Sequence, residues 1–450
     1  MAVHTSGTFQ RTAFNSAATM SDRIARTYVA SALSVLCALP YLLGIQEQRL
    51  NVWSLVFTSG EGDPAKQAAL LVLYCVGVLL LIVQVPPRWL LFVGAPLLIL
   101  LAWSLVSIIW SVNPDGSARR LVALFGTVAL GAFAGIRFDV AEFIRLLTKV
   151  AAIVIVASFV VAVVQPEFGL DPEGRLRGVF FHKNYLASFA AIAMFTIFLR
   201  LTVKMDRNAT TKVLLGLLFI LCFFSLALSR SAGPLPALFV ALMTVGVVQA
   251  SRVSNGMFRS LVPMAISLGV VCAGALVIFV GGSMFERGAD LSGRTEVWKF
   301  AALMIEQRPW LGYGYGVFWL GENAPGAAFW RSSLNFVPHA HNGYLQLALD
   351  TGAIGLGCLA AALISFAIKV GLLLRHRQNA RLLWAVGFIA FFCVINLGEA
   401  DAWLGNDLHT ILFVYVMVHT NVEYARYTGL AFNLRKSKVA LRTPGSGSFA

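Results

Sequence analysis

Long apolar runs alternate with short polar connections along most of the chain, and this pattern predicts membrane-spanning helices. A spanning helix needs roughly 20 mainly apolar residues. Twelve runs approach or exceed this length: 28–45, 67–85, 89–110, 119–137, 144–165, 184–203, 211–229, 232–250, 259–281, 352–374, 380–398 and 407–425. Helices satisfy their own backbone hydrogen bonds in lipid, whereas open strands do not. The pattern therefore predicts an all-α polytopic membrane protein with about twelve transmembrane helices.

One connection is far longer than the others and divides the chain. We expect a cytoplasmic N-terminal tail at 1–27, helices one to nine within 28–281, a large periplasmic loop at 282–351, helices ten to twelve within 352–425, and a cytoplasmic C-terminal tail at 426–450. Apolar residues recur in the long loop at helical spacing, which predicts an amphipathic helix; they are Val297, Phe300, Ala301, Met304 and Ile305. The GYGYG segment, Gly312 to Gly316, fits no nucleotide-binding loop and is interpreted as a flexible turn.

The composition excludes several classes of function. Of 450 residues, 58% are hydrophobic and 12% are charged, whereas a soluble domain carries roughly 25% charged residues. A soluble globular enzyme, a disordered chain and a nucleic-acid-binding domain are therefore excluded. The net charge of +14 does not reopen the last class, because basic residues in a membrane protein mark its cytoplasmic side.

The charges predict the orientation. With the N-terminus, the C-terminus and the loops after even-numbered helices on one side, that side holds 22 of 35 basic and 5 of 21 acidic residues. The other side holds 13 basic and 16 acidic residues. The positive-inside rule therefore places both termini in the cytoplasm.

Several basic residues lie on the predicted outer side, where the positive-inside rule does not explain them. They come from three separate connections, and a fourth adds a carboxylate: Arg175, Arg177, His182 and Lys183; Arg230; Arg294, His339 and His341; Glu399. If these connections converge, they form a basic pocket. Guanidinium groups bind phosphate through two hydrogen bonds, so the pocket suits an anionic ligand.

Simpler interpretations stay open for these arginines. Arg175 and Arg177 are also explained as loop charges that pair with Asp171 and Glu173. Arg230 interrupts an apolar stretch, at a cost of roughly 2.5–3.5 kcal/mol if it lies centrally in the membrane. This cost favours a functional role for Arg230. The alternative is that Arg230 is a turn residue whose charge reaches the membrane surface. Arg294 alone is equally explained as part of a solvated helix face.

The segment PHAHNGY, residues 338–344, contains two histidines one residue apart. Histidine exchanges a proton near neutral pH, so one of them is a candidate general base. A metal site is the second interpretation, although a third ligand at short spacing is missing. A structural histidine at a helix start is the third.

Together these residues resemble the bacterial O-antigen ligase and polysaccharide polymerase superfamily. The resemblance rests on RLRGVFFHKNYLA (175–187), LALSRSAGPL (226–235), GRTEVWKFAALMIEQRPWLGYGYGVFW (293–319) and PHAHNGYLQLALDTGAIGLG (338–357). It covers about residues 65–425, and 175–360 is its specific part. Within the superfamily the chain looks most like exopolysaccharide polymerases of the ExoQ type.

The resemblance implies a membrane glycosyltransferase that uses neither a metal nor any other cofactor. Its donor and partner would be an oligosaccharide on undecaprenyl diphosphate, at the periplasmic face of the bacterial inner membrane. Arg230 and Arg294, and less firmly Arg177, match the positions that bind the diphosphate. His341, followed by Asn342, matches the family's essential histidine, with His339 as its rival. Arg175, His182, Lys183, Asn342 and Glu399 are candidates for supporting roles.

The resemblance leaves the acceptor open. A polymerase passes the glycan to the next lipid-linked repeat unit, whereas an O-antigen ligase passes it to lipid A–core. Membrane lipid and other polysaccharide-export membrane proteins are further candidate partners. A lipid-linked oligosaccharide transporter is the alternative from another class, although transporters often contain internal repeats and broken helices at the midplane, and the candidate polar residues cluster at the outer face. A purely structural assembly role is the third alternative.

Overall fold

The protein is described by a computed structural model that covers residues 20–38, 64–203, 206, 208–253, 290–333, 337–376 and 381–429. These residues form helices joined by turns, and the only β-type pairing among them is an isolated bridge between Leu170 and Leu176. The predicted all-α class is confirmed for the described chain.

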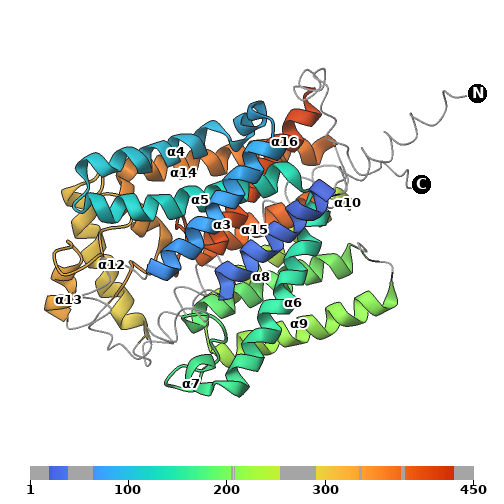
Figure 1. Ribbon diagram of the computed structural model, residues 1–450, viewed down its shortest axis with the longest axis horizontal. Coiled ribbons are helices and arrows are strands. Elements are labelled where there is room, and N and C mark those ends of the chain that lie inside the picture. The colour runs from blue at the N-terminus through green and yellow to red at the C-terminus, as the bar shows by residue number, and fades with distance from the viewer. Residues whose placement is uncertain are drawn as a thin grey trace, which may run out of the picture.

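The first described helix spans residues 20–38. The helices that follow are α3 (Pro64–Gln84), η2 (Pro87–Val93), α4 (Ala95–Val106), η3 (Ser107–Trp110), α5 (Pro114–Arg137), α6 (Val140–Val164), α7 (Pro166–Gly169), α8 (Lys183–Thr202), α9 (Ala209–Ser229), α10 (Pro234–Val253), α12 (Asp290–Gln307), α13 (Ala327–Ser333), α14 (Gly343–His376), α15 (Arg381–Ile395) and α16 (Leu408–Tyr427). Figure 1 shows α12 and α13 together at the left of the view, beside the ends of α4, α5 and α14.

Most predicted spans within the described residues fall on one helix, whereas 89–110 is divided among η2, α4 and η3. The span at 28–45 is described only to residue 38, and the span at 259–281 lies outside the described residues. Six of these helices are long and apolar enough to cross a membrane, or seven if the pair η2 and α4–η3, bent by 88°, forms one broken span. Large apolar side chains such as Leu71, Ile82 and Val163 are exposed on the helices, where lipid would cover them. The chain is therefore an integral membrane protein, and the number twelve stays a prediction.

Some predicted boundaries differ from the structure. The first helix begins at residue 20, within the predicted N-terminal tail. Its polar residues are held by ion pairs: Arg26 with Glu142 at 2.7 Å, and Asp22 with Arg137. The predicted loop 282–351 contains α12, α13 and the first turns of α14, because α14 begins at Gly343 and bends at Gly352.

Close helix contacts hold the centre of the bundle together. A Cβ atom on Gly131 of α5 would lie 2.8 Å from the carbonyl oxygen of Ile411 on α16, and one on Gly135 would lie 2.9 Å from that of Tyr415. Small residues four apart allow such close packing of membrane helices. Phe143 of α6 also stacks on Tyr415 of α16, with ring centroids 3.7 Å apart. These contacts hold α5 and α6 against α16, which follows the loop that contains Glu399.

The long connection has a hydrophobic core of its own. Val297 and Ala301 of α12 are buried in it, and Phe300 packs against Phe318 and Trp319. The apolar spacing thus predicted α12 correctly, and its apolar face packs on protein.

The GYGYG segment is a turn, as expected, but the interpretation as a flexible one is wrong. Gly312, Gly314 and Gly316 have φ angles of 68°, 102° and 72°, which glycine adopts without strain. Tyr313 and Tyr315 between them are buried. The N–H groups of Tyr313 and Gly314 donate to Leu349 and Asp350 on α14, at 2.8 and 3.1 Å. The alternation of glycine and tyrosine therefore fixes this loop against α14.

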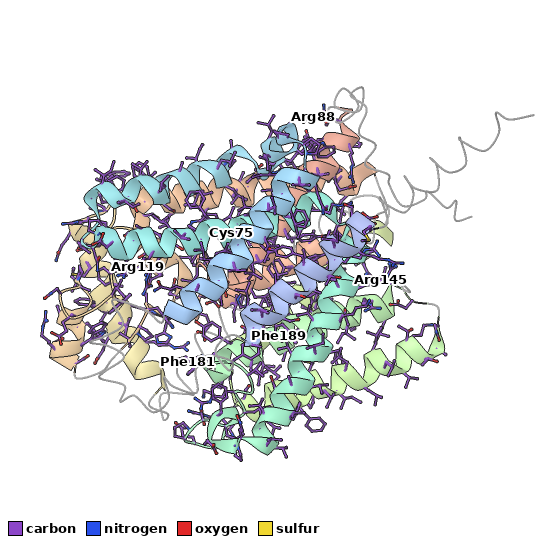
Figure 2. The ribbon with its side chains drawn as sticks, in the orientation of Figure 1. Cys75, Arg88, Arg119, Arg145, Phe181 and Phe189 are labelled. Atoms are coloured by element: carbon purple, nitrogen blue, oxygen red, sulfur yellow. The ribbon has the colours of Figure 1, made fainter. Side chains whose placement is uncertain are left out.

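The arginines assigned to opposite sides by the charge pattern are widely separated. Figure 2 shows Arg88 and Arg145, both predicted to be cytoplasmic, toward the right of the view. Arg119, at the predicted outer end of α5, lies toward the left, near α12 and α13. The orientation relative to the membrane stays a prediction.

We expect Gly352→Ala to lower the melting temperature of the detergent-solubilised protein. Gly352 has a φ of 68°, and an added Cβ would lie 2.1 Å from the carbonyl oxygen of Trp310. A non-glycine residue in such a conformation costs about 1–3 kcal/mol, and the close contact adds to it. Gly357→Ala on the same helix is the control, because nothing lies within 4 Å of the added atom. Equal melting temperatures for the two variants would contradict this account of the bend.

Candidate active site

Arg230 forms the sharp turn between α9 and α10. It caps the C-terminus of α9 in the left-handed conformation, with φ 49° and ψ 36°, and Pro234 then begins α10. Its side chain is exposed. A non-glycine residue rarely adopts this conformation, and the described chain has only three with positive φ: Arg230, His341 and Asn406. Strained residues of this kind cluster at functional sites, and two of these three are residues that the sequence singled out.

The buried carboxylate of Glu399 joins several chain segments. Its Oε1 accepts a hydrogen bond from the side-chain amide of Asn184 at 2.8 Å, and Arg294 Nη2 lies 3.6 Å from the same oxygen. The Ser231 hydroxyl donates in turn to Asn184 Oδ1 at 3.0 Å. The start of α8, the α9–α10 turn, α12 and the loop before α16 therefore meet at one point.

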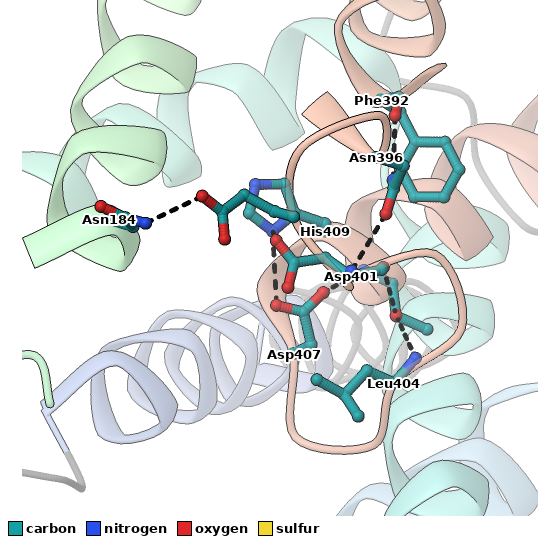
Figure 3. A network of polar contacts seen from close by, with 9 residues as sticks. Asn184, Phe392, Asn396, Asp401, Leu404, Asp407 and His409 are labelled. Carbon is teal, nitrogen blue, oxygen red and sulfur yellow. Dashed lines mark hydrogen bonds and ion pairs between the residues drawn. The ribbon is translucent and has the colours of Figure 1, made fainter. Parts of the chain in front are cut away.

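Figure 3 shows Asn184 reaching from α8 toward Asp401 and Asp407, in the loop between α15 and α16, and toward His409 in the first turn of α16. Burial raises the pKa of the Glu399 carboxyl, whereas Arg294 and the hydrogen bond from Asn184 act in the opposite direction. The two groups thus favour the ionised carboxylate in a place that disfavours charge.

Arg294 keeps donors available for another group. Its distance of 3.6 Å from Glu399 exceeds the roughly 2.7–2.9 Å of a charge-assisted hydrogen bond. The side chain is also about one quarter exposed, at 26%. A guanidinium has five N–H donors. Glu399 therefore holds the charge of Arg294 in place without consuming its capacity to bind an anion.

The two histidines belong to a segment that is anchored on both sides. Trp298 of α12 donates its indole N–H to the carbonyl of Ala340 at 3.0 Å. On the other side, Gly343 donates its N–H to Asn396 at 2.9 Å. The Asn342 amide donates to the carbonyl of Leu397 at 3.3 Å, and its Oδ1 accepts from the N–H groups of Tyr344 and Leu345 at the start of α14.

His339 and His341 lie against each other, with ring centroids 4.2 Å apart. The backbone N–H of His341 donates to Nδ1 of His339 at 3.2 Å. Burial lowers the pKa of His339, and the charges of His341, His182 and Arg294 act in the same direction, so that together they bring it to about 3. These four side chains are thus close enough to interact electrostatically, and His339 stays neutral at physiological pH.

The structure assigns Arg175 and Arg177 to their own loop. Arg175 Nε lies 2.5 Å from Asp171, and Arg175 Nη1 lies 2.5 Å from Glu173. Arg177 donates to the carbonyls of Phe168 and Glu167 at 2.6 and 3.1 Å, and it lies over the Phe168 ring. These contacts favour the simpler interpretation for Arg175 and give Arg177 a structural role around α7.

His182 and Lys183 stand at the start of α8. His182 is exposed and caps the helix, since its Nδ1 accepts from the N–H of Asn184 at 3.3 Å. Lys183 is buried. His182 thus borders the histidine pair, whereas the group that links α8 to the site is Asn184.

One further cluster was not predicted as a unit. His409 Nδ1 lies 3.3 Å from Asp407 and 3.4 Å from Asp401, and all three side chains are buried. Among the described residues they are the one group of three or more whose ligand atoms are close enough to share a metal ion. The same contacts also describe a hydrogen-bonded network, because Asp407 accepts from the N–H of Thr410 at 2.8 Å and so caps α16. The spacing of Asp407 and His409 two residues apart is the signal that could have found it.

Asn184 and Ser231 were missed as site residues. Each follows a residue that the sequence did single out, but Asn184 lies 215 positions from its partner Glu399, and Ser231 lies 47 positions from its partner Asn184. Such a pairing leaves no local pattern in the sequence.

Two comparisons with known proteins bear on this arrangement. Residues 217–360 match the family model described as O-antigen ligase. The chain is 25% identical over 301 residues to the exopolysaccharide production protein ExoQ of Rhizobium meliloti (strain 1021), and the alignment covers 64% of this chain and 68% of that protein. The matched family segment includes Arg230, Arg294, His339 and His341. The resemblance expected from the sequence is therefore confirmed: the chain is similar to the O-antigen ligase and polysaccharide polymerase family, and within it to ExoQ.

Proposed function

We propose that this protein is a membrane glycosyltransferase that polymerises exopolysaccharide repeat units. It would transfer a glycan from undecaprenyl diphosphate to the next lipid-linked unit, at the periplasmic face of the inner membrane and with both termini in the cytoplasm. The observation that carries the proposal is the meeting of Arg294 with His182, His339 and His341 beside the buried Glu399. A basic site next to imidazoles suits a reaction in which a hydroxyl loses a proton and a diphosphate departs.

The arginines would bind the diphosphate of the donor. Arg294 has donors to spare, and Arg230 presents an exposed side chain from the turn whose next residue, Ser231, hydrogen-bonds to Asn184. Guanidinium groups would neutralise the negative charge that develops on the leaving diphosphate, which is the step that such groups accelerate most. The polyprenyl tail would stay in lipid while the charged head enters the polar site.

His341 is the better candidate for the general base. Nδ1 of His339 accepts a hydrogen bond from the backbone N–H of His341, so the proton of neutral His339 is on Nε2 and no lone pair is left to take another proton. His339 would instead position its neighbour. His341 has the left-handed backbone conformation, with a φ of 48°.

The proposed transfer needs no cofactor, because one bond to the anomeric carbon forms as another breaks. The acceptor hydroxyl oxygen forms a bond to the anomeric carbon of the donor, and its proton passes to the imidazole of His341. The bond between the anomeric carbon and the diphosphate oxygen breaks, and undecaprenyl diphosphate leaves as an anion between the arginines. The activated donor linkage supplies the driving force, so no nucleotide is consumed.

Transfer to lipid A–core is the second candidate, because the matched family model is described as O-antigen ligase. The printed name of the relative ExoQ, an exopolysaccharide production protein, favours polymerisation.

Reconstitution distinguishes these two candidates. We expect the purified protein in liposomes to convert undecaprenyl-diphosphate-linked repeat units alone into a ladder of longer chains, resolved by gel electrophoresis. EDTA should leave the initial rate unchanged, because the proposed chemistry uses no metal. Product that forms only after lipid A–core is added would establish a ligase. Loss of activity in EDTA with recovery in a divalent metal would contradict the metal-free mechanism and direct attention to Asp401, Asp407 and His409.

We expect Arg294→Ala and Arg230→Ala to lower kcat/KM by about 10²-fold or more, the typical loss for one group that stabilises charge in the transition state. Arg294→Lys should recover part of this activity, because lysine keeps the charge but lacks the bidentate fork. Arg175→Ala is the matched control and should stay within about twofold of wild type, since Arg175 pairs with Asp171 and Glu173. Initial rates at equal protein levels in the membrane would measure this, and full activity of Arg294→Ala would remove it from the site.

The pH dependence separates the two histidines. His339 has a pKa of about 3 in the folded protein, against about 6.5 in the unfolded chain. Between these values the unfolded state binds more protons, so His339 contributes stability above pH 6.5 that is lost as the pH falls toward 3. We therefore expect His339→Gln to show a smaller drop in melting temperature than wild type over this range.

If His339 were the base, the activity of wild type would persist as the pH falls until its pKa of about 3 is reached; because the proposed base is His341, we expect the activity not to follow the pKa of His339. His341→Ala should lose turnover but still bind the lipid donor. Activity that persists to about pH 3, together with an active His341→Ala variant, would reverse the roles.

A further inference from the structure

A cavity of about 220 Å³ lies behind the histidine segment, and none of the diphosphate-binding arginines lines it. At about 30 Å³ for each water molecule in the liquid, it would hold roughly seven waters, the space of a single sugar ring. Its walls come from α5, α8, the loop after α12, the histidine segment, α14 and the loop before α16. The lining residues used below are Arg120, Trp319, His339, Gln346, Asp350 and Trp403.

The side chains of an arginine and a buried aspartic acid border this cavity. Asp350 on α14 is buried, and its carboxylate accepts a hydrogen bond from the Gln346 amide at 3.1 Å. Arg120 on α5 is near enough to interact with it electrostatically, yet the Arg120 side chain is exposed, as expected of a residue that borders open space. A guanidinium and a carboxylate together offer donors and acceptors to the hydroxyl groups of a neutral ligand.

Gln346 is held in a single orientation. Its Oε1 accepts from the indole N–H of Trp319 and from the backbone N–H of Ala340, both at 3.1 Å. Its NH₂ group is therefore directed to Asp350. This hydrogen-bonded chain connects the cavity wall to Ala340, which separates the two histidines, so the cavity and the proposed base share one rigid support.

The remaining walls are aromatic. Trp319 and Trp403 line the cavity. Their N–H groups are already used within the protein, by Gln346 and by Ser104 Oγ at 3.2 Å. They thus offer apolar surface to a ligand. Pockets that combine aromatic surface with a few fixed polar groups bind small organic molecules, and a sugar ring has both apolar C–H faces and polar hydroxyls.

We infer that this cavity binds the acceptor sugar, an uncharged ring whose hydroxyl attacks the donor. The inference rests on the proposed function and extends it to the second substrate. His339 lines the cavity, and His341 lies next to it at 4.2 Å between ring centroids, so a hydroxyl on a ring held there is close to the base. Pro338, also in the wall, is exposed, which gives the ring a way in.

Two variants test the cavity by different means. Asp350→Asn removes the charge with little change in shape, and Leu347→Phe fills the cavity that Leu347 lines without touching its polar groups. Ile364→Phe is the matched control, because Ile364 is on the same helix but is 60% exposed. Melting temperatures in detergent establish that each variant is folded, and if one cavity variant fails to fold, the other still tests the inference.

The probes are a free repeat-unit oligosaccharide, prepared by partial hydrolysis of the polysaccharide, and undecaprenyl diphosphate without sugar. Measured by isothermal titration calorimetry, both cavity variants should weaken oligosaccharide binding by about 10-fold or more. Binding of undecaprenyl diphosphate should change by less than about twofold, and Arg294→Ala should show the opposite pattern. With the oligosaccharide as acceptor, the cavity variants should raise its KM more than they lower kcat.

Several outcomes would overturn the inference: no saturable binding of the oligosaccharide to wild type, unchanged binding in both cavity variants, or equal loss for both probes. The proposed function fails separately, if wild type binds the oligosaccharide yet forms no product from lipid-linked units.

Discussion

The buried carboxylate of Glu399 is the interaction on which the rest of the site depends. It contacts Asn184 from α8 and Arg294 from α12, and Asn184 brings in Ser231 from the turn after α9. A buried charge is tolerated only where partners compensate it, so Glu399 helps to fix the relative position of these chain segments. Arg294 in particular would otherwise be free to extend into water.

The apolar pattern was enough to predict the helices, because lipid requires long apolar segments whatever their tertiary contacts. It also predicted the buried face of α12 and the turn at Arg230, which falls between the predicted spans 211–229 and 232–250. Boundaries differed where polar groups pair over a distance, as Asp22 does with Arg137. The ion pair extends the first helix into a segment that composition alone marked as a tail.

The candidate site was predictable only in part, because its side chains also meet across long distances in the sequence. Residue type and apparent location drew attention to Arg230, Arg294 and the two histidines. The same criteria equally selected Arg175, whose charge is neutralised within its own loop, since a sequence does not say which side chains point inward. The cavity could not be foreseen either, because Arg120 and Asp350 lie 230 positions apart and come to border one cavity only in the folded protein.

On the proposed function, the arrangement separates recognition of charge from recognition of sugar. The arginines would bind the diphosphate, the cavity would bind one ring, and the histidine segment between them is fixed by Trp298 on one side and Asn396 on the other. A polymerase meets donors whose glycans differ in length, although the reacting atoms are the same each time. Binding only the diphosphate and one acceptor ring keeps the reaction geometry constant, because neither contact depends on how long the chain has grown.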